Sequence, residues 1–180
     1  AERLQELSRL LAVERATQLP TGCELFVGLE IADVGADDLP ATLTRLQQIL
    51  GTERRLVAVI PDAAVADIPY LRSFLTQLRS AGLGIAYDGF SGSSQQLRTR
   101  REFSADYVLL SPAAVRGIER SSERQRQMAE LTSVAREQGS QLIAAGVHTE
   151  NEATACTRAG VMLATGELFG TTFTIDAAAD

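Results

Sequence analysis

Apolar residues follow two patterns along this chain, helical stripes and short continuous runs. Leucines recur at helical spacing from Leu4 to Leu11 and predict a helix over residues 2–18. Residues 56–60 instead form an unbroken apolar run of strand length. Such runs are typical of strands that are covered on both faces, so the two patterns together predict an α/β fold.

The alternation continues along the chain and predicts six strands, which are expected at residues 25–29, 56–60, 83–88, 106–110, 142–145 and 161–165. Helices are expected at 2–18, 38–50, 67–80, 94–101, 121–138 and 149–159, with a short helical turn at Pro112. Asp37 or Asp38 would cap the second helix, Pro40 lies in its first turn, and Gly51 follows its end. Repeated strands and helices indicate a parallel sheet, either an open doubly wound sheet or a (β/α) barrel.

The length of 180 residues fits one domain. We expect an N-terminal helix over 1–20, a strand–helix portion over 24–170, which is a barrel portion in the (β/α) barrel alternative, and a C-terminal tail over 171–180. Within that tail, 171–175 would form an extended segment, and the last residues would be frayed.

Composition excludes several function classes. The net charge of −6 argues against nucleic-acid binding, which needs a basic surface. No apolar run reaches the ~20 residues of a transmembrane helix. Cys23 and Cys156 lie far apart and belong to no metal motif, which favours reduced thiols and a cytoplasmic location. All 17 cationic residues are arginine, and the clusters at 98–101 and 120–126 are typical of a solvated helix face.

Four segments, 56–62, 85–92, 105–111 and 142–149, resemble successive barrel strands of the EAL domain, the bacterial fold that hydrolyses cyclic di-GMP. The ending Leu168-Phe169-Gly170 and the run Ala-Ala-Gly-Val-His-Thr over 144–149 carry the resemblance best, since the family has Ala-Glu-Gly-Val-Glu-Thr there. The resemblance implies a TIM-barrel-like EAL fold, partial, with about six parallel strands. The family's first two strands have no counterpart here, so we expect a partial barrel or a fragment of a longer protein.

In a parallel barrel the functional groups lie at the C-terminal ends of the strands. The resemblance places eight residues at this mouth as a vestigial ligand-binding site: Gly28, Val59, Asp88, Gly89, Leu109, Ser111, Ala145 and Thr165. The family's metal-binding Asn is replaced by Gly28, and Val59 and Ala145 stand where it has metal-binding Glu. Leu109 occupies the position of the catalytic Lys, and the chain contains no lysine.

The other positions follow the same trend. Asp88 retains the first aspartate of the family's Asp-Asp pair, and Gly89 replaces the second. A Glu of the family corresponds to His148, the only histidine, which is expected at a helix start. One carboxylate cannot hold two divalent ions, so we expect no metal, no cofactor and no catalytic residue. Asp88 is more typical of a residue that caps the following loop.

The loop of Phe90, Ser91, Gly92 and Ser93 lies where the family forms its dimer interface. It lacks the lysine of a phosphate-binding loop. A partial barrel also has open sheet edges, which the N-terminal helix or another chain must cover. We therefore expect a catalytically inactive EAL-like signalling module that acts through protein–protein interaction or dimerisation. A non-hydrolysing receptor for cyclic di-GMP or another nucleotide is the alternative, and an active phosphodiesterase or an unrelated α/β domain ranks below both.

Overall fold

The computed structural model describes residues 2–34, 36, 38–66, 68–91, 93–99 and 101–170. The predictions made for Asp37, for Gly92 and for the tail over 171–180 lie outside the described residues. The chain divides into two compact units, which meet in sequence between Ile85 and Ala86. None of the helices in the described ranges is both long and apolar enough to cross a membrane.

The strands are β1 Glu24–Gly28, β2 Arg55–Pro61, β3 Gly84–Phe90, β4 Tyr107–Leu110, β5 Gln141–Ala145 and β6 Leu163–Thr165. The α-helices are α1 Glu2–Ala16, α2 Ile31–Val34, α3 Leu39–Leu50, α4 Ile68–Ser80, α5 Ser94–Thr99, α6 Pro112–Val115, α7 Ser122–Glu137 and α8 Glu150–Arg158. Four 3-10 turns complete the described fold: η1 Asp62–Ala66, η2 Arg101–Phe103, η3 Ile118–Arg120 and η4 Glu167–Phe169.

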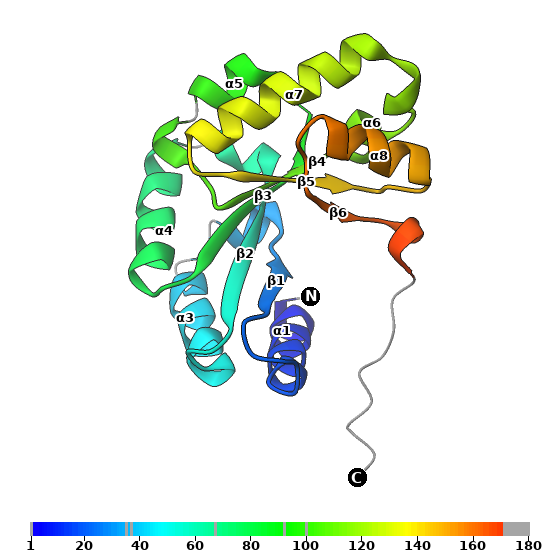
Figure 1. The fold of residues 1–180 in the computed structure, drawn as a ribbon. Coiled ribbons are helices and arrows are strands. Elements are labelled where there is room, and N and C mark those ends of the chain that lie inside the picture. Colours follow the sequence, from blue (N-terminus) through cyan, green and yellow to red (C-terminus); the bar gives the residue numbers. More distant parts are fainter. Residues whose placement is uncertain are drawn as a thin grey trace. The chain divides into compact units, whose positions relative to one another are not determined.

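The strands occur in the sheet in the order β1-β2-β3-β4-β5-β6, and helices alternate with them along the chain (Figure 1). The strand pairs β1·β2, β3·β4, β4·β5 and β5·β6 are parallel. A doubly wound sheet reverses its strand order at a switch point, whereas a (β/α) barrel keeps the order of the sequence. The strand order therefore confirms the prediction of a six-stranded, TIM-barrel-like α/β fold and excludes the doubly wound alternative.

In the first unit, β1 and β2 pair in register from Glu24↔Arg55 to Gly28↔Val59. The buried stripe of α3 faces inward and consists of Leu39, Pro40, Leu43, Leu46 and Leu50. Pro40 and Gly51 occupy the predicted positions at the two ends of this helix. Asp38 occupies the predicted N-cap position of α3, but its backbone angles are helical and its side chain makes no capping hydrogen bond. A capping residue normally has an extended backbone.

The helix predicted at the N-terminus is present as α1, but Leu7 and Leu11 of its leucine stripe face outward. Leu7 and Leu11 are 51% and 47% exposed, whereas Val13 and Ala16 are buried. Helical spacing shows which residues share a face, and only the packing of the unit decides which face turns inward.

In the second unit, β4 pairs with β5 through Leu110↔Ala144, and β5 pairs with β6 through Ala145↔Thr165. Helices α5 and α7 contact each other and lie side by side in Figure 1. The loop predicted to begin at residue 89 begins later, because β3 continues through Gly89 and Phe90. Phe90 is buried, so its side chain packs as a strand residue rather than standing in a loop.

Candidate functional site

Two of the predicted mouth positions lie in the first unit, on the neighbouring strands β1 and β2. Gly28 ends β1 and is the register partner of Val59 in β2. A cavity of about 450 Å³ lies beside Gly28, and it is lined by Ser8, Arg9, Ala12 and residues 26–30. Arg9, the one cation in this lining, forms an ion pair with Asp33, and both side chains are largely buried. Neither predicted mouth residue offers a lone pair to a metal ion.

The other predicted mouth positions lie in the second unit. Ala145 ends β5 and is the register partner of Thr165, which ends β6, so the strand pairing brings these two together. Leu109 is half-buried in β4, and Ser111 follows that strand directly. These four side chains supply two hydroxyl groups and no charge.

Asp88 is the one carboxylate among the predicted positions, and it lies on β3 with its side chain exposed. The loop that Asp88 is expected to cap includes Gly92, which lies outside the described residues, so the capping of this loop stays a prediction. Ser93 caps α5: its backbone N–H donates to Gln96 Oε1 at 2.7 Å, and its hydroxyl accepts from the Gln96 N–H at 3.4 Å. In the described ranges no three His, Cys, Asp or Glu side chains gather to hold a metal ion.

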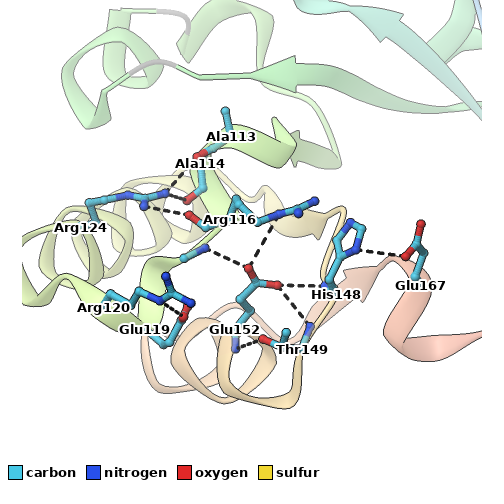
Figure 2. Close-up of polar contacts among 11 residues, drawn as sticks. Ala113, Ala114, Arg116, Glu119, Arg120, Arg124, His148, Thr149, Glu152 and Glu167 are labelled. Atoms are coloured by element: carbon cyan, nitrogen blue, oxygen red, sulfur yellow. Dashed lines mark hydrogen bonds and ion pairs between the residues drawn. The ribbon is translucent and has the colours of Figure 1, made fainter.

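The Glu152 carboxylate (Figure 2) is a buried polar group of the second unit and is 3% exposed. It accepts hydrogen bonds from the backbone N–H groups of Gly117 at 2.9 Å, His148 at 2.9 Å and Thr149 at 3.2 Å. The Arg116 guanidinium lies 3.9 Å away. Glu152 therefore ties the residues after α6 to the loop 146–149 at the end of β5.

These contacts set the charge state of Glu152. The hydrogen bond from Gly117 and then that from His148 lower the pKa of the carboxyl, burial opposes them, and Thr149 and Arg116 lower it further. The carboxylate also raises the pKa of the buried Cys156 thiol, although burial is the larger cause. A buried thiol with a raised pKa is a packing residue rather than a nucleophile.

His148 lies where the sequence predicts it, at the start of a helix, immediately before the Thr149 N-cap of α8. Its Nδ1 is 3.1 Å from the Oε2 of Glu167, which belongs to η4 after β6. The same turn is packed tightly, because a Cβ at Gly166 would lie 2.2 Å from the Val147 carbonyl oxygen. The strand-end loop 146–149 is thus fixed from one side by Glu152 and from the other by residues 165–168.

A second feature of this unit is a groove of about 520 Å³, which we call the α6–α7 groove. It is lined by Phe90, Ser91, Ser93, Ser94, Leu110, Ala113, Ala114, Arg124, Gln127, Met128, Glu130 and Leu131. Three of the predicted interface residues, Phe90, Ser91 and Ser93, are in this lining. The structure therefore places the predicted interface segment at a real concavity rather than on a flat surface.

Arg124 forms one wall of the groove and contradicts the prediction of a uniformly solvated arginine cluster. Its guanidinium donates to the carbonyl oxygens of Arg116 at 2.9 Å, Ala113 at 2.9 Å and Ala114 at 3.0 Å. The neighbouring Arg120 and Arg126 are 85% and 77% exposed, as the prediction has it. On α7, Arg126 forms an ion pair with Glu123, three residues earlier in the helix.

Sequence reasoning missed both Glu152 and Arg124. A signal for Glu152 was present, since Thr149 followed three residues later by a Glu is the pattern of a capping box, and the structure contains that box. Arg124 gave no signal of its own, because a cation in a charged helix looks the same whether it is solvated or bonded to carbonyl groups.

The chain is similar to a known protein family and to several solved structures. The family model of the EAL domain matches residues 2–172. No curated protein sequence matches the chain. The chain resembles Klebsiella pneumoniae BlrP1, solved as a complex with calcium and cyclic di-GMP, at 26% sequence identity and a TM-score of 0.79. That match covers 92% of this chain and 43% of BlrP1, so the chain spans less than half of that protein.

Two isolated EAL domains are similar in fold. The EAL domain of Mycobacterium smegmatis DcpA has 22% identity and a TM-score of 0.80, and the match covers 93% of this chain and 76% of that one. The EAL domain of Xanthomonas citri FimX, in complex with cyclic di-GMP, has 14% identity and a TM-score of 0.81. That match covers 98% of this chain and 72% of the FimX chain. At these identities the likeness concerns the fold alone.

Proposed function

The chain belongs to the EAL domain family, and on that premise we propose that it is a catalytically inactive member that acts by associating with a second copy through the α6–α7 groove. The observation that carries the inactivity is the chemistry of the predicted mouth. Gly28, Val59 and Ala145 offer no side-chain lone pair, and Leu109 offers no charge. A two-metal site needs several oxygen ligands, so these residues do not fit the ions that the family's chemistry requires.

The groove supports the second half of the proposal. The resemblance assigns the 90–93 segment to the family's dimer interface, and the described residues of that segment line the groove. Apolar side chains such as Leu110, Met128 and Leu131 contribute to its lining, and its charged groups are already bonded within the chain. Glu130 accepts from the Ser94 hydroxyl at 2.6 Å, and Arg124 is occupied by carbonyl oxygens. A concave surface with apolar side chains, whose Arg124 and Glu130 already hold hydrogen-bond partners within the chain, suits a protein partner better than an anionic nucleotide.

The test is the mass of the 180-residue protein in solution, measured by sedimentation equilibrium together with a matched pair of variants. Ala113 and Ala129 are both exposed helical alanines, but Ala113 lines the groove and Ala129 does not. We expect a dimer that Ala113→Glu weakens at least about tenfold and that Ala129→Glu leaves intact, because a carboxylate in a closed interface loses hydration. A monomeric wild-type protein, or equal effects of the two variants, would contradict this use of the groove.

A receptor that binds cyclic di-GMP without hydrolysis is the second candidate. Cyclic di-GMP is present in the BlrP1 and FimX complexes named above, and those proteins share this fold. Isothermal titration with cyclic di-GMP in the absence of metal ions tests it. Saturable binding in the micromolar range would support the receptor, and the lack of any heat would support association alone. Hydrolysis of cyclic di-GMP is the activity that the residues of this chain support least.

A further inference from the structure

The segment 112–121, which we call the groove-wall segment, is held in place largely by side chains from other elements. It contains only the four-residue helix α6 and the three-residue turn η3. Elements this short make few hydrogen bonds of their own, and most of their carbonyl groups need partners from elsewhere. The partners therefore help to fix the backbone path of this segment, beside the few backbone hydrogen bonds that it forms itself.

Helix α7 supplies the partners on one side. Arg124 donates to the carbonyl oxygens of Ala113, Ala114 and Arg116. The Gln125 carboxamide donates to those of Ile118 at 3.1 Å and Glu119 at 3.3 Å. Two side chains of α7 thus serve five carbonyl groups of the groove-wall segment, and Ala113 and Ala114 are themselves part of the groove.

The strand-end loop 146–149 holds the segment from the other side, at two separate points. Glu152 accepts from Gly117 with one oxygen and from His148 and Thr149 with the other, so one carboxylate bridges the segment and the loop (Figure 2). Gly146 packs directly on the segment as well, because a Cβ there would lie 2.9 Å from Pro112 Cβ. The loop cannot shift without disturbing the backbone around Pro112 or Gly117.

We propose that the groove-wall segment couples the strand-end loop 146–149 to the α6–α7 groove, with Arg124 and Glu152 as its two positioning residues. This inference rests on the proposed function, since it makes the association through the groove sensitive to whatever displaces the loop. Coupling requires an element that both sites can bias. The segment meets that condition because side chains from both directions add to its few backbone hydrogen bonds, such as that from the Arg116 N–H to the Pro112 carbonyl oxygen.

The test is hydrogen–deuterium exchange of the 180-residue protein, followed in peptides that cover 112–121 and 144–150. Arg124→Ala removes contacts to the segment alone, yet we expect it to speed exchange in the loop peptide too. Glu152→Gln is expected to speed exchange around Ala113 and Ala114, which it does not touch. The expected factor at the distant site is roughly tenfold, the change that about 1.4 kcal/mol produces.

Two exposed residues provide the controls: Arg126→Ala on α7 and Arg158→Ala on α8 should change neither peptide. Gly146→Ala reaches the segment through Pro112 rather than Glu152, so it keeps the test usable if the Glu152 variant does not fold. Faster exchange confined to each residue's own contacts would overturn the coupling. Exchange is measured within one chain and does not depend on dimer formation. A monomeric protein in which each variant still speeds exchange at the distant site would refute the dimer alone. A dimer in which the distant site does not respond would refute the coupling alone.

Discussion

A carboxylate that is removed from water must find donors inside the protein, and Glu152 finds three of them on the backbone. These bonds favour its charged form, which is why its pKa is lowered despite burial. The sequence shows this residue as one acid among 23 acidic residues, and only the capping-box spacing distinguishes it. Its importance comes from contacts with Gly117 and Arg116, which are far away in the sequence.

The pH dependence of stability provides a test of this network. A carboxyl with a lowered folded pKa contributes stability that is complete above its usual value of 4.5 and is lost as the pH falls through the folded pKa. We therefore expect Glu152→Gln to lower the free energy of unfolding by roughly 2–3 kcal/mol near neutral pH and by less near pH 3. Urea unfolding at both pH values measures it. Glu150→Gln, on the exposed face of the same helix, is the control, and a pH-independent loss in Glu152→Gln would contradict the network.

Gly166 makes a second prediction at this scale. Its φ of 154° lies in the region that favours glycine, and a Cβ would come within 2.2 Å and 2.4 Å of the Val147 backbone oxygen and nitrogen. The Val147 backbone atoms cannot move away as the end of a flexible side chain can. We therefore expect Gly166→Ala to cost about 3–5 kcal/mol of unfolding free energy. Gly51→Ala also changes a glycine with positive φ but meets open space, and it should cost about 1 kcal/mol. Equal losses in thermal or urea unfolding would show that the tight turn has no special role.

At the scale of elements, α3 and α8 both begin after a residue type that favours the N-cap position, but only α8 has the Glu three residues later that completes a capping box. Thr149 accepts from the Glu152 N–H at 3.2 Å and completes a capping box, whereas Asp38 makes no capping bond. We expect Thr149→Ala to cost about 1 kcal/mol of unfolding free energy and Asp38→Ala to be close to neutral. Urea denaturation of the two alanine variants tests the contrast. A cost for Asp38→Ala as large as that for Thr149→Ala would contradict the geometry at α3.

The strength of the local sequence pattern determines which elements of the fold can be predicted. Unbroken apolar runs gave strands such as β2 and β5 within a residue at each end, because a strand buried on both faces has a strong pattern of its own. Elements such as α2 and η1 are too short for any periodicity, so they were not predicted. The hydrogen bonds from Arg124 to the carbonyl groups in and after α6 were not predicted for a different reason. They depend on how α6 packs against α7 and not on the sequence of either helix alone.

At the scale of the whole molecule, the fold of the EAL family is present while most predicted mouth positions lack the groups that metal chemistry needs. The strand order preserves the framework, and residues such as Val59, Leu109 and Ala145 occupy strand-end positions without charge. The proposed association rests on the α6–α7 groove and on the strand-end loop that we propose is coupled to it. The central claim is therefore that this domain associates and does not cleave.

The most direct test is titration calorimetry of the purified protein with cyclic di-GMP, with and without Mg²⁺, followed by chromatography of the nucleotide after incubation. The account predicts no metal-dependent heat and no linear dinucleotide product. Metal-dependent cleavage that disappears in the Asp88→Ala variant would contradict it, because it would mean that the one remaining carboxylate still supports catalysis.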